Sequence, residues 1–346
     1  MKKLLKHMKS IDYTKEKHTF LIISYLFLAT IMIGCKENEN EIQHKKQITF
    51  DHVEVLYDVL PSGNYTGIHF TSQNTAYTIT NNGKIFKTED GGNTWIEQHS
   101  STELHLHDIF FLNDLNGYIV GGDTDGIILK TTDGGNTWKS TTFQIRLSSI
   151  YFINETTGFA SGKKLLSTQD GGKTWNEVDL EYFAYGGINF FDGKTGFLAA
   201  GNILLKTIDG GSSWEVVDKI SNIIGTNTIG KIQINKGVAY LRLNGDKMYR
   251  TSDKGNTWQI LNVPIISGSV HFINEHQAIG VGQRWYELGY YPDGLLCVTN
   301  DGGKHWDEKY FPATEFYIIN DIAFLNDSTA LAIGNSSQGC IIKLKF

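Results

Sequence analysis

Short apolar runs separated by glycine-rich turns fill the chain from residue 48 to the C-terminus. Residues 107–140 are representative and read HDIFFLNDLNGYIVGGDTDGIILKTTDGGNTWKS. Within them, DIFFL, GYIVGG, GIILKT and TWKS each have the length and the β-branched or aromatic content of a strand. The pattern therefore predicts a unit of four strands joined by tight turns.

This four-strand pattern recurs along the chain. The first strands of the repeats begin near Ile68, Ile109, Ile150, Ile188, Ile232, Val270 and Ile322. A repeat of about forty residues with strand content is typical of propeller blades. We therefore expect an all-β fold, a seven-bladed β-propeller of four-stranded blades.

The two ends of the repeat region complement each other. The last repeat, residues 321–346, stops after its third strand, which would leave an open sheet edge. The segment ITFDHVEVLYD, residues 48–58, is an isolated strand pattern before the first repeat. We expect this N-terminal strand to complete the last blade and close the ring. A six-bladed ring with the last repeat as an appendage is the alternative.

An octapeptide such as TTDGGNTW lies between the third and fourth strands of the repeats. Its glycines permit positive φ, its aspartate can accept backbone N–H groups, and its tryptophan can pack between blades. Calcium loops or catalytic aspartates are the alternatives, but one aspartate per turn supplies too few oxygens for calcium. We expect structural roles for Asp90, Trp95, Asp133, Trp138, Asp170, Trp175, Asp209, Trp214, Asp253, Trp258, Asp301 and Trp306.

The octapeptide resembles the Asp-box, or BNR, repeat of sialidases, sortilin-like ectodomains and some glycoside hydrolases. With DIFFLNDLNGYIVGG before it, the repeat is most similar to the photosystem II assembly and stability factor family, which has relatives in non-photosynthetic bacteria. The resemblance covers nearly all of residues 48–346 and implies a seven-bladed binding scaffold. Asp-boxes occur in enzymes and scaffolds alike, so the resemblance implies the fold more strongly than the function.

Residues 1–34 have the character of a signal peptide. Lysines precede the apolar run at 20–33, which is short for a bilayer span. Gly34 and Cys35 resemble a bacterial lipobox, which implies a lipid on Cys35 as the first residue of the mature protein. An uncleaved anchor helix is the alternative. Residues 35–46 are polar and aperiodic and are expected to be a flexible tether, with the propeller at 47–346.

The lipid on Cys35 implies a place in the bacterial cell envelope. Lys36, rather than aspartate, follows the cysteine, which by the lipoprotein pattern favours the outer membrane. We expect a protein anchored there on the periplasmic side or at the cell surface. Two or three acyl chains would hold it stably on a membrane.

The net charge and the arginine motifs exclude some classes of function. A net charge of -6, without basic clusters in the body of the chain, argues against nucleic-acid binding. The resemblance to sialidases would imply three converging arginines and an Arg-Ile-Pro motif, and the sequence has no such motif. A general glycoside hydrolase needs only two carboxylates, so a carbohydrate-active enzyme with carboxylates on the loop face is the alternative to a scaffold. No nucleotide or cofactor motif is present, and no cofactor is expected.

Histidines and cysteines offer little more chemistry. His105 and His107 alternate, which could put two imidazoles on one side of a strand as metal ligands. No third ligand is identifiable in the sequence, so no metal site is expected. Cys297 and Cys340 align out of register between neighbouring repeats, which favours free thiols over a disulfide.

Loops that depart from a repeat are where binding residues are usually found. The largest departure is QRWYELGYYPDG, residues 283–294, and two further aromatic connections lie at 180–187 and 309–321. The expected binding residues are Arg284, Trp285, Tyr286, Tyr290, Tyr291, Tyr310, Phe311, Phe316 and Tyr317. The alternative is that these aromatic residues cover the seam between the last two blades.

Together these observations predict a monomeric, membrane-anchored lipoprotein. Its propeller is expected to bind an envelope protein or a glycan without catalysis, as a rigid scaffold whose loops need little ordering on binding.

Overall fold

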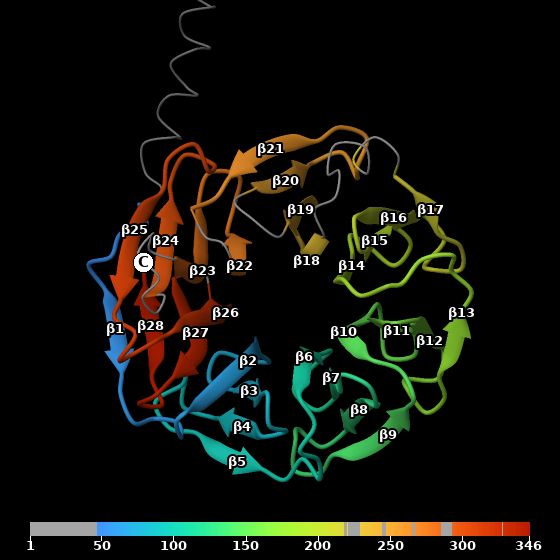
Figure 1. The fold of residues 1–346 in the computed structure, drawn as a ribbon, viewed down its shortest axis with the longest axis horizontal. Helices are drawn as coiled ribbons and strands as arrows, with labels where there is room; N and C mark the ends of the chain where they lie inside the picture. Colours follow the sequence, from blue (N-terminus) through green and yellow to red (C-terminus); the bar gives the residue numbers. More distant parts are fainter. Residues whose placement is uncertain are drawn as a thin grey trace, which may run out of the picture. The chain divides into compact units, whose positions relative to one another are not determined.

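The computed structural model describes residues 47–217, 220, 229–243, 247–264, 267–284, 293–326 and 328–346. The chain divides into two units, Met1–Gln47 and Ile48–Phe346, and the second unit is a β-propeller (Figure 1). The predicted signal peptide, the lipidation of Cys35 and the tether lie outside the described residues. Among the described residues, no helix is long and apolar enough to pass through a bilayer.

The strands fall into four concentric positions in the ring (Figure 1). The inner strands are β2 (Gly63–Phe70), β6 (Leu106–Phe111), β10 (Leu147–Phe152), β14 (Ile188–Phe190), β18 (Ile229–Asn235), β22 (Ser267–Phe272) and β26 (Ile318–Asn326). The second strands are β3 (Ala76–Thr80), β7 (Gly117–Gly121), β11 (Gly158–Gly162), β15 (Gly196–Ala200), β19 (Val238–Leu243), β23 (Ala278–Arg284) and β27 (Thr329–Ser336).

The third and outer positions complete each sheet. The third strands are β4 (Ile85–Thr88), β8 (Gly126–Thr131), β12 (Leu165–Thr168), β16 (Ile203–Thr207), β20 (Lys247–Thr251), β24 (Asp293–Thr299) and β28 (Ile341–Lys345). The outer strands are β5 (Ile96–Gln98), β9 (Lys139–Phe143), β13 (Asn176–Val178), β17 (Glu215–Val216), β21 (Gln259–Asn262), β25 (Asp307–Phe311) and β1 (Val53–Leu56).

The prediction of seven separate four-stranded blades is wrong. Within the described ranges, five sheets have four strands each, and a sixth sheet has eight strands in the order β1-β28-β27-β2-β3-β4-β5, with β26 also paired to β27. The larger sheet is continuous because Gly63 and Asn64 at the start of β2 pair with Ser336 and Asn335 of β27. The architecture is therefore an all-β propeller with five four-stranded blades and one eight-stranded sheet.

The N-terminal strand lies where the end of the last repeat needs a partner. β1 pairs antiparallel with β28, with Val53 opposite Leu344 and Leu56 opposite Ile341. Further upstream, the backbone N–H of Ile48 donates to Asn300 Oδ1 at 2.9 Å, and Asn300 Nδ2 donates back to the Ile48 carbonyl at 2.9 Å. These contacts cover the edge of β28, so the last repeat is part of the ring and not an appendage.

Aromatic rings fill the seams between neighbouring sheets. Tyr118 of β7 stacks on Phe152 of β10, with ring centroids 3.8 Å apart, and Trp175 meets the same Phe152 edge-on at 5.9 Å. Gly158 leaves room for this ring, because a Cβ there would lie 2.5 Å from Phe152 Cε1. Tyr77 and Phe111 repeat the stack one seam earlier, with centroids 4.2 Å apart. The core of the molecule therefore lies between sheets rather than within one layer.

The carboxylate of each Asp-box aspartate is hydrogen-bonded within its own turn, as Asp133 shows. Asp133 Oδ1 accepts from Thr131 Oγ1 at 2.8 Å and from the Thr137 N–H at 2.9 Å, while Oδ2 accepts from Thr137 Oγ1 at 2.6 Å. These bonds, led by the one from the Thr137 hydroxyl, lower the pKa of Asp133 to about 2. Gly134 and Gly135 have φ of 67° and 80°, which a residue with a side chain rarely adopts. The pattern supports a structural role for the box.

Two of the Asp-boxes also form hydrogen bonds with the preceding sheet. The Tyr77 hydroxyl of β3 donates to the carbonyl of Gly134 in the following box at 2.6 Å, and the Tyr118 hydroxyl donates to Gly171 at 3.0 Å. Neighbouring strands of a blade run antiparallel, so the box after the third strand lies at one end of the strands, and the connection from the fourth strand to the next inner strand lies at the other end. The boxes and these connections therefore lie on opposite faces.

Candidate functional site

The inner strands line a central channel that contains a cavity of about 420 Å³. The Ile or Val at the middle of each strand packs into the seams, and because strand residues alternate in direction, its two neighbours line the channel. The neighbours that line the cavity are Asp108, Ser149, Gly187, Lys231, Ser269 and Asp321 before the apolar residue, and His69, Phe110, Tyr151, Asn189, Gln233 and His271 after it. Most side chains at these two positions are therefore polar or charged, although apolar residues also line the cavity.

An ion pair spans part of the channel. Lys231 Nζ of β18 lies 2.8 Å from Asp321 Oδ1 of β26, and Asp321 Oδ2 accepts from the Ile68 N–H of β2 at 3.3 Å. Desolvation opposes both charges, but their attraction for each other outweighs it, so the pKa of Lys231 is raised and the pKa of Asp321 is lowered. Both side chains are charged at neutral pH.

Asp108 is the second carboxylate of the channel. Its Oδ2 accepts from Ser149 Oγ at 2.7 Å and from the Ile150 N–H at 3.0 Å, both in the next sheet, and its Oδ1 accepts from the Ile109 N–H at 3.0 Å. Burial raises the pKa of Asp108 despite these bonds. Asp108 and Asp321 hold equivalent positions and both bond to a backbone N–H of the next inner strand.

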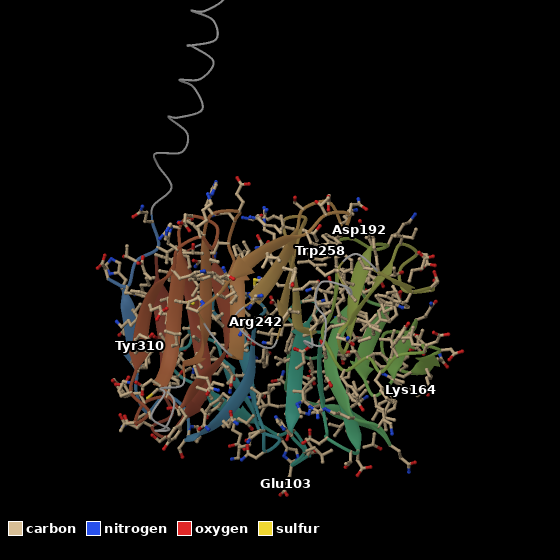
Figure 2. All side chains as sticks on the ribbon, turned by 45° about the horizontal axis from the view of Figure 1, so that its top comes forward. Glu103, Lys164, Asp192, Arg242, Trp258 and Tyr310 are labelled. Atoms are coloured by element: carbon tan, nitrogen blue, oxygen red, sulfur yellow. The ribbon has the colours of Figure 1, made fainter. Side chains whose placement is uncertain are left out.

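Two histidines on the channel wall, His69 and His271, are half-buried and neutral. His271 Nδ1 lies 3.0 Å from Gln233 Nε2, and its Nε2 lies 3.1 Å from Ser269 Oγ. Burial lowers the pKa of His271 to about 4 and that of His69 to about 4. A buried arginine, Arg242 of β19, also contributes to the lining, and Figure 2 labels it near the centre of the ring.

An exposed aromatic pair stands at the mouth of the channel. Phe183 and Tyr185, in the predicted aromatic connection at 180–187, are 58% and 44% exposed, and their ring centroids are 5.7 Å apart. Tyr185 also lines the cavity. The connection is fixed by its backbone, because the N–H groups of Gly186 and Gly187 donate to Ala199 and Gly230 at 3.1 Å. The pair is therefore a preformed apolar surface next to a cavity that contains charged and polar side chains.

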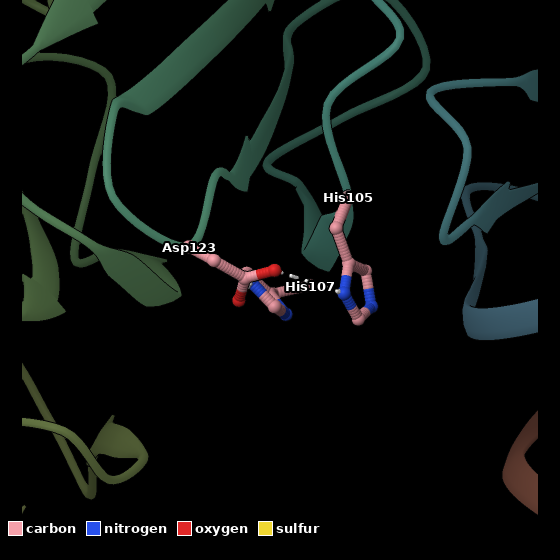
Figure 3. Close-up of side chains that lie close together, drawn as sticks. All are labelled: His105, His107 and Asp123. Carbon is pink, nitrogen blue, oxygen red and sulfur yellow. Dashed lines mark ion pairs between the residues drawn. The ribbon is translucent and has the colours of Figure 1, made fainter.

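Three potential metal ligands meet beside the same mouth (Figure 3). His107 Nε2 lies 3.2 Å from Asp123 Oδ1, and His105 Nδ1 lies 3.6 Å from Asp123 Oδ2. The three ligand atoms lie within 4.8 Å of one another, and this is the only such group of three in the described part of the chain. The sequence offered His105 and His107 but no third ligand. The structure supplies Asp123 from the turn between β7 and β8.

The predicted aromatic site is only partly described. Trp285, Tyr286, Tyr290 and Tyr291 lie outside the described residues, and Arg284 is the last residue of β23. The Tyr310 hydroxyl donates to Glu308, and Tyr310 and Tyr317 are partly exposed.

Phe311 and Phe316 belong to the core instead. They are 3% and 0% exposed and contact each other edge-on in a hydrophobic cluster. Their side chains therefore offer no surface for a ligand, while binding at the rest of the patch stays a prediction.

The two cysteines of the described region are free and buried. Cys297 and Cys340 form no disulfide. Burial raises the pKa of the Cys297 thiol, so it is an unreactive neutral group.

Sequence reasoning missed the channel residues, although a signal for them exists. In each repeat, the residues on either side of the first-strand Ile or Val must face away from the seam. Asp108, Lys231 and Asp321 are charged at this position, where a residue facing the core would be apolar.

Comparisons with known proteins place the fold. The sequence profile of a family described as photosynthesis system II assembly factor YCF48 matches residues 42–148, 97–182 and 143–281. No curated protein matches the chain. A structure titled "YCF48 bound to D1 peptide" is similar with a TM-score of 0.64 at 16% identity, over 87% of this chain and 98% of that chain.

Two other solved structures bear on the function. YCF48 from Cyanidioschyzon merolae has a TM-score of 0.62 at 14% identity, over 85% of this chain and 98% of that one. The Niastella koreensis GH74 enzyme has a TM-score of 0.64 at 16% identity, over 82% of this chain and 53% of that one. At these identities the likenesses show the propeller fold alone.

Proposed function

Because this chain belongs to the photosynthesis system II assembly factor YCF48 family, we propose that it is a non-catalytic binding scaffold that holds a segment of a partner protein at the mouth of its central channel. A solved relative is titled as bound to a D1 peptide, which supports a peptide segment as the ligand class. The partner of this chain is an envelope protein, in keeping with the lipoprotein-like N-terminus.

One observation carries this proposal: an exposed aromatic pair borders a cavity that contains charged and polar side chains. Phe183 and Tyr185 offer apolar contact area, and the cavity of about 420 Å³ has the size of a site for one or two side chains. Lys231 and Asp321 inside it are charged and can pair with either sign. Because backbone bonds fix the aromatic connection, little ordering would oppose binding.

The tether is the second part of the proposal. The lipobox-like Gly34-Cys35 motif anchors the scaffold to the outer membrane through acyl chains on the cysteine. Replacing Cys35 with serine should move the full chain from the membrane to the soluble fraction and remove the mass of the lipid. Retention of Cys35→Ser in the membrane would contradict lipid anchoring and favour an uncleaved helix.

A hydrolase is the competing function, because Asp108 and Asp321 share one cavity and their pKa values shift in opposite directions. Against it, the carboxylate oxygens of both residues already accept bonds that join neighbouring strands. The full chain should release no product from xyloglucan or other envelope glycans. Turnover that Asp108→Asn or Asp321→Asn abolishes would favour the enzyme.

Site-specific photocrosslinking tests the scaffold directly. A photoreactive residue replaces Tyr185 at the mouth or, as the matched control, Ile208, which is 69% exposed in an Asp-box turn. In the native envelope, position 185 should give a discrete crosslinked protein and position 208 should not. Equal crosslinking at both positions, or at neither, would contradict binding at the mouth.

A further inference from the structure

The cluster of His105, His107 and Asp123 beside the channel mouth has the chemistry of a transition-metal site. Imidazole nitrogens with one carboxylate are the ligand set that Zn²⁺ and similar borderline divalent ions take, whereas Mg²⁺ and Ca²⁺ prefer oxygen alone. The donors come from two segments of one blade: the start of β6 and the turn that follows β7.

The distances between the donors fit a small ion. Bonds of about 2.0–2.2 Å at a tetrahedral centre put neighbouring ligand atoms about 3.3–3.5 Å apart. His107 Nε2 and His105 Nδ1 lie 3.2 Å and 3.6 Å from the two Asp123 oxygens. The side chain of His105 is 34% exposed, so a small rotation can bring its nitrogen to the centre.

The backbone holds these side chains in place. The ladder between β6 and β7 shifts register between Leu106 and Asp108, which makes His107 the bulged residue and redirects its side chain. The N–H of Gly122 donates to the His105 carbonyl at 2.8 Å, and this bond draws the turn that carries Asp123 over the histidines. At Gly121 a Cβ would lie 2.2 Å from the His105 carbonyl oxygen, so this approach requires glycine.

A second observation points to a missing ligand. His107 Nε2 is buried and, among the described residues, has no hydrogen-bond partner of acceptable geometry, although Asp123 lies close to it. A buried nitrogen without a hydrogen-bond partner is unfavourable and is rare in folded proteins unless water or an ion satisfies it. A bound cation would satisfy it.

The repeat itself does not require these residues. In the next blade, Leu147 pairs with Gly162 as Leu106 does with Gly121, and the Lys163 N–H donates to Arg146 as Gly122 does to His105. Arg146, Ser148 and Lys164 there hold the places of His105, His107 and Asp123. The same backbone thus carries no ligand set one blade further on.

We propose that His105, His107 and Asp123 bind one divalent transition-metal ion of the zinc type at the rim of the channel. The three protein ligands leave at least one position for water or for a group of a bound molecule. Arg146 Nη1 lies 3.6 Å from Asp123 Oδ1 and competes with the ion for that carboxylate. The site does not depend on the proposed scaffold function.

Metal titration of the full chain in mild detergent tests the proposal. After removal of metals with a chelator, calorimetry with Zn²⁺ and visible absorption with Co²⁺ should each report one equivalent that excess Mg²⁺ does not displace. His107→Gln and Asp123→Asn should each weaken Zn²⁺ binding at least tenfold. His99→Gln, at an exposed histidine outside the cluster, should leave it unchanged.

Two variants separate a loss of metal binding from a loss of folding. Asp123 is 57% exposed, so Asp123→Asn preserves the fold even if His107→Gln does not. Arg146→Gln removes the competing cation and should tighten Zn²⁺ binding several-fold. Absence of a Zn²⁺ equivalent, equal binding by the wild type and Asp123→Asn, or no tightening in Arg146→Gln would overturn the site.

Discussion

The Asp-box turns and the central channel are both repeated around the ring, yet they use their repeated positions in opposite ways. In the boxes similar residue types recur. The carboxylate oxygens of each box aspartate accept hydrogen bonds within their own turn, as those of Asp90 do from Thr88 and Thr94. In the channel the backbone position recurs, but its side chain is Asp108, Ser149 or Lys231. Recurring chemistry therefore builds the ring, and varied chemistry at recurring positions gives this protein its own surface.

Truncating a box tryptophan should lower the stability of the ring more than any other change considered for the boxes or the channel. Trp138 is 8% exposed and packs edge-on against Phe111 in the seam with Tyr77. Trp138→Ala should lower the free energy of unfolding by about 3–5 kcal/mol, because it leaves a cavity between sheets. Chemical denaturation measures this change, and Ile96→Ala, at a residue 67% exposed on an outer strand, is the control. Equal effects of the two variants would contradict the wedge role of the tryptophan.

Removing one box hydroxyl should have the next largest effect. Thr131 Oγ1 donates to Asp133 and accepts from the buried N–H of Gly135 at 2.9 Å. Thr131→Val keeps the shape of the side chain but leaves the N–H of Gly135 without an acceptor. The free energy of unfolding should therefore fall by about 1–3 kcal/mol. Thr142→Val, at an exposed strand position, should change it by less than about 0.5 kcal/mol. A neutral Thr131→Val would mean that the box hydrogen bonds are dispensable.

The strands and the boxes could be predicted from sequence because both are local. Alternation sets a strand, and Asp133 with Gly134 and Gly135 sets a turn, whatever the rest of the chain does. The sheet count could not be predicted in this way. It depends on the pairing of Gly63 and Asn64 with residues near the C-terminus, and no local pattern encodes that contact.

The candidate sites show the same limit. His105 and His107 were visible as an alternating pair, but Asp123 joins them only through the turn held by the Gly122 N–H. The seam aromatics Phe311 and Phe316 looked like surface residues, because aromatic content in a loop does not reveal which way a ring packs. The channel position itself was readable from alternation around the first-strand Ile or Val.

Acid should affect the channel more than the boxes. Burial lowers the pKa of His271 to about 4 from its ordinary 6.5, so the unfolded chain takes up a proton there that the folded chain does not. Stability from this group is complete above about pH 6.5 and is lost as pH falls toward 4.

The free energy of unfolding should therefore drop between pH 7 and 5, by roughly 1–2 kcal/mol for this histidine. His271→Gln should flatten the dependence, while His99→Gln controls for the change of residue type. An unchanged slope in His271→Gln would show that the channel wall admits a proton freely.

The smallest effect on stability should come with the largest effect on binding. Tyr185 is 44% exposed at the channel mouth and contacts Phe183, so Tyr185→Ala should change the free energy of unfolding by no more than about 0.5 kcal/mol. If the mouth binds a partner segment, the same variant should lose most of the partner captured by the full chain, because exposed aromatic anchors dominate such interfaces. Ile208→Ala, at an exposed apolar residue in an Asp-box turn, should leave both stability and capture unchanged. The opposite result, partner capture that persists in Tyr185→Ala but is lost in Ile208→Ala, would reverse the comparison. The face with the Asp-boxes would then be the binding face, and the channel residues would serve only to join the sheets.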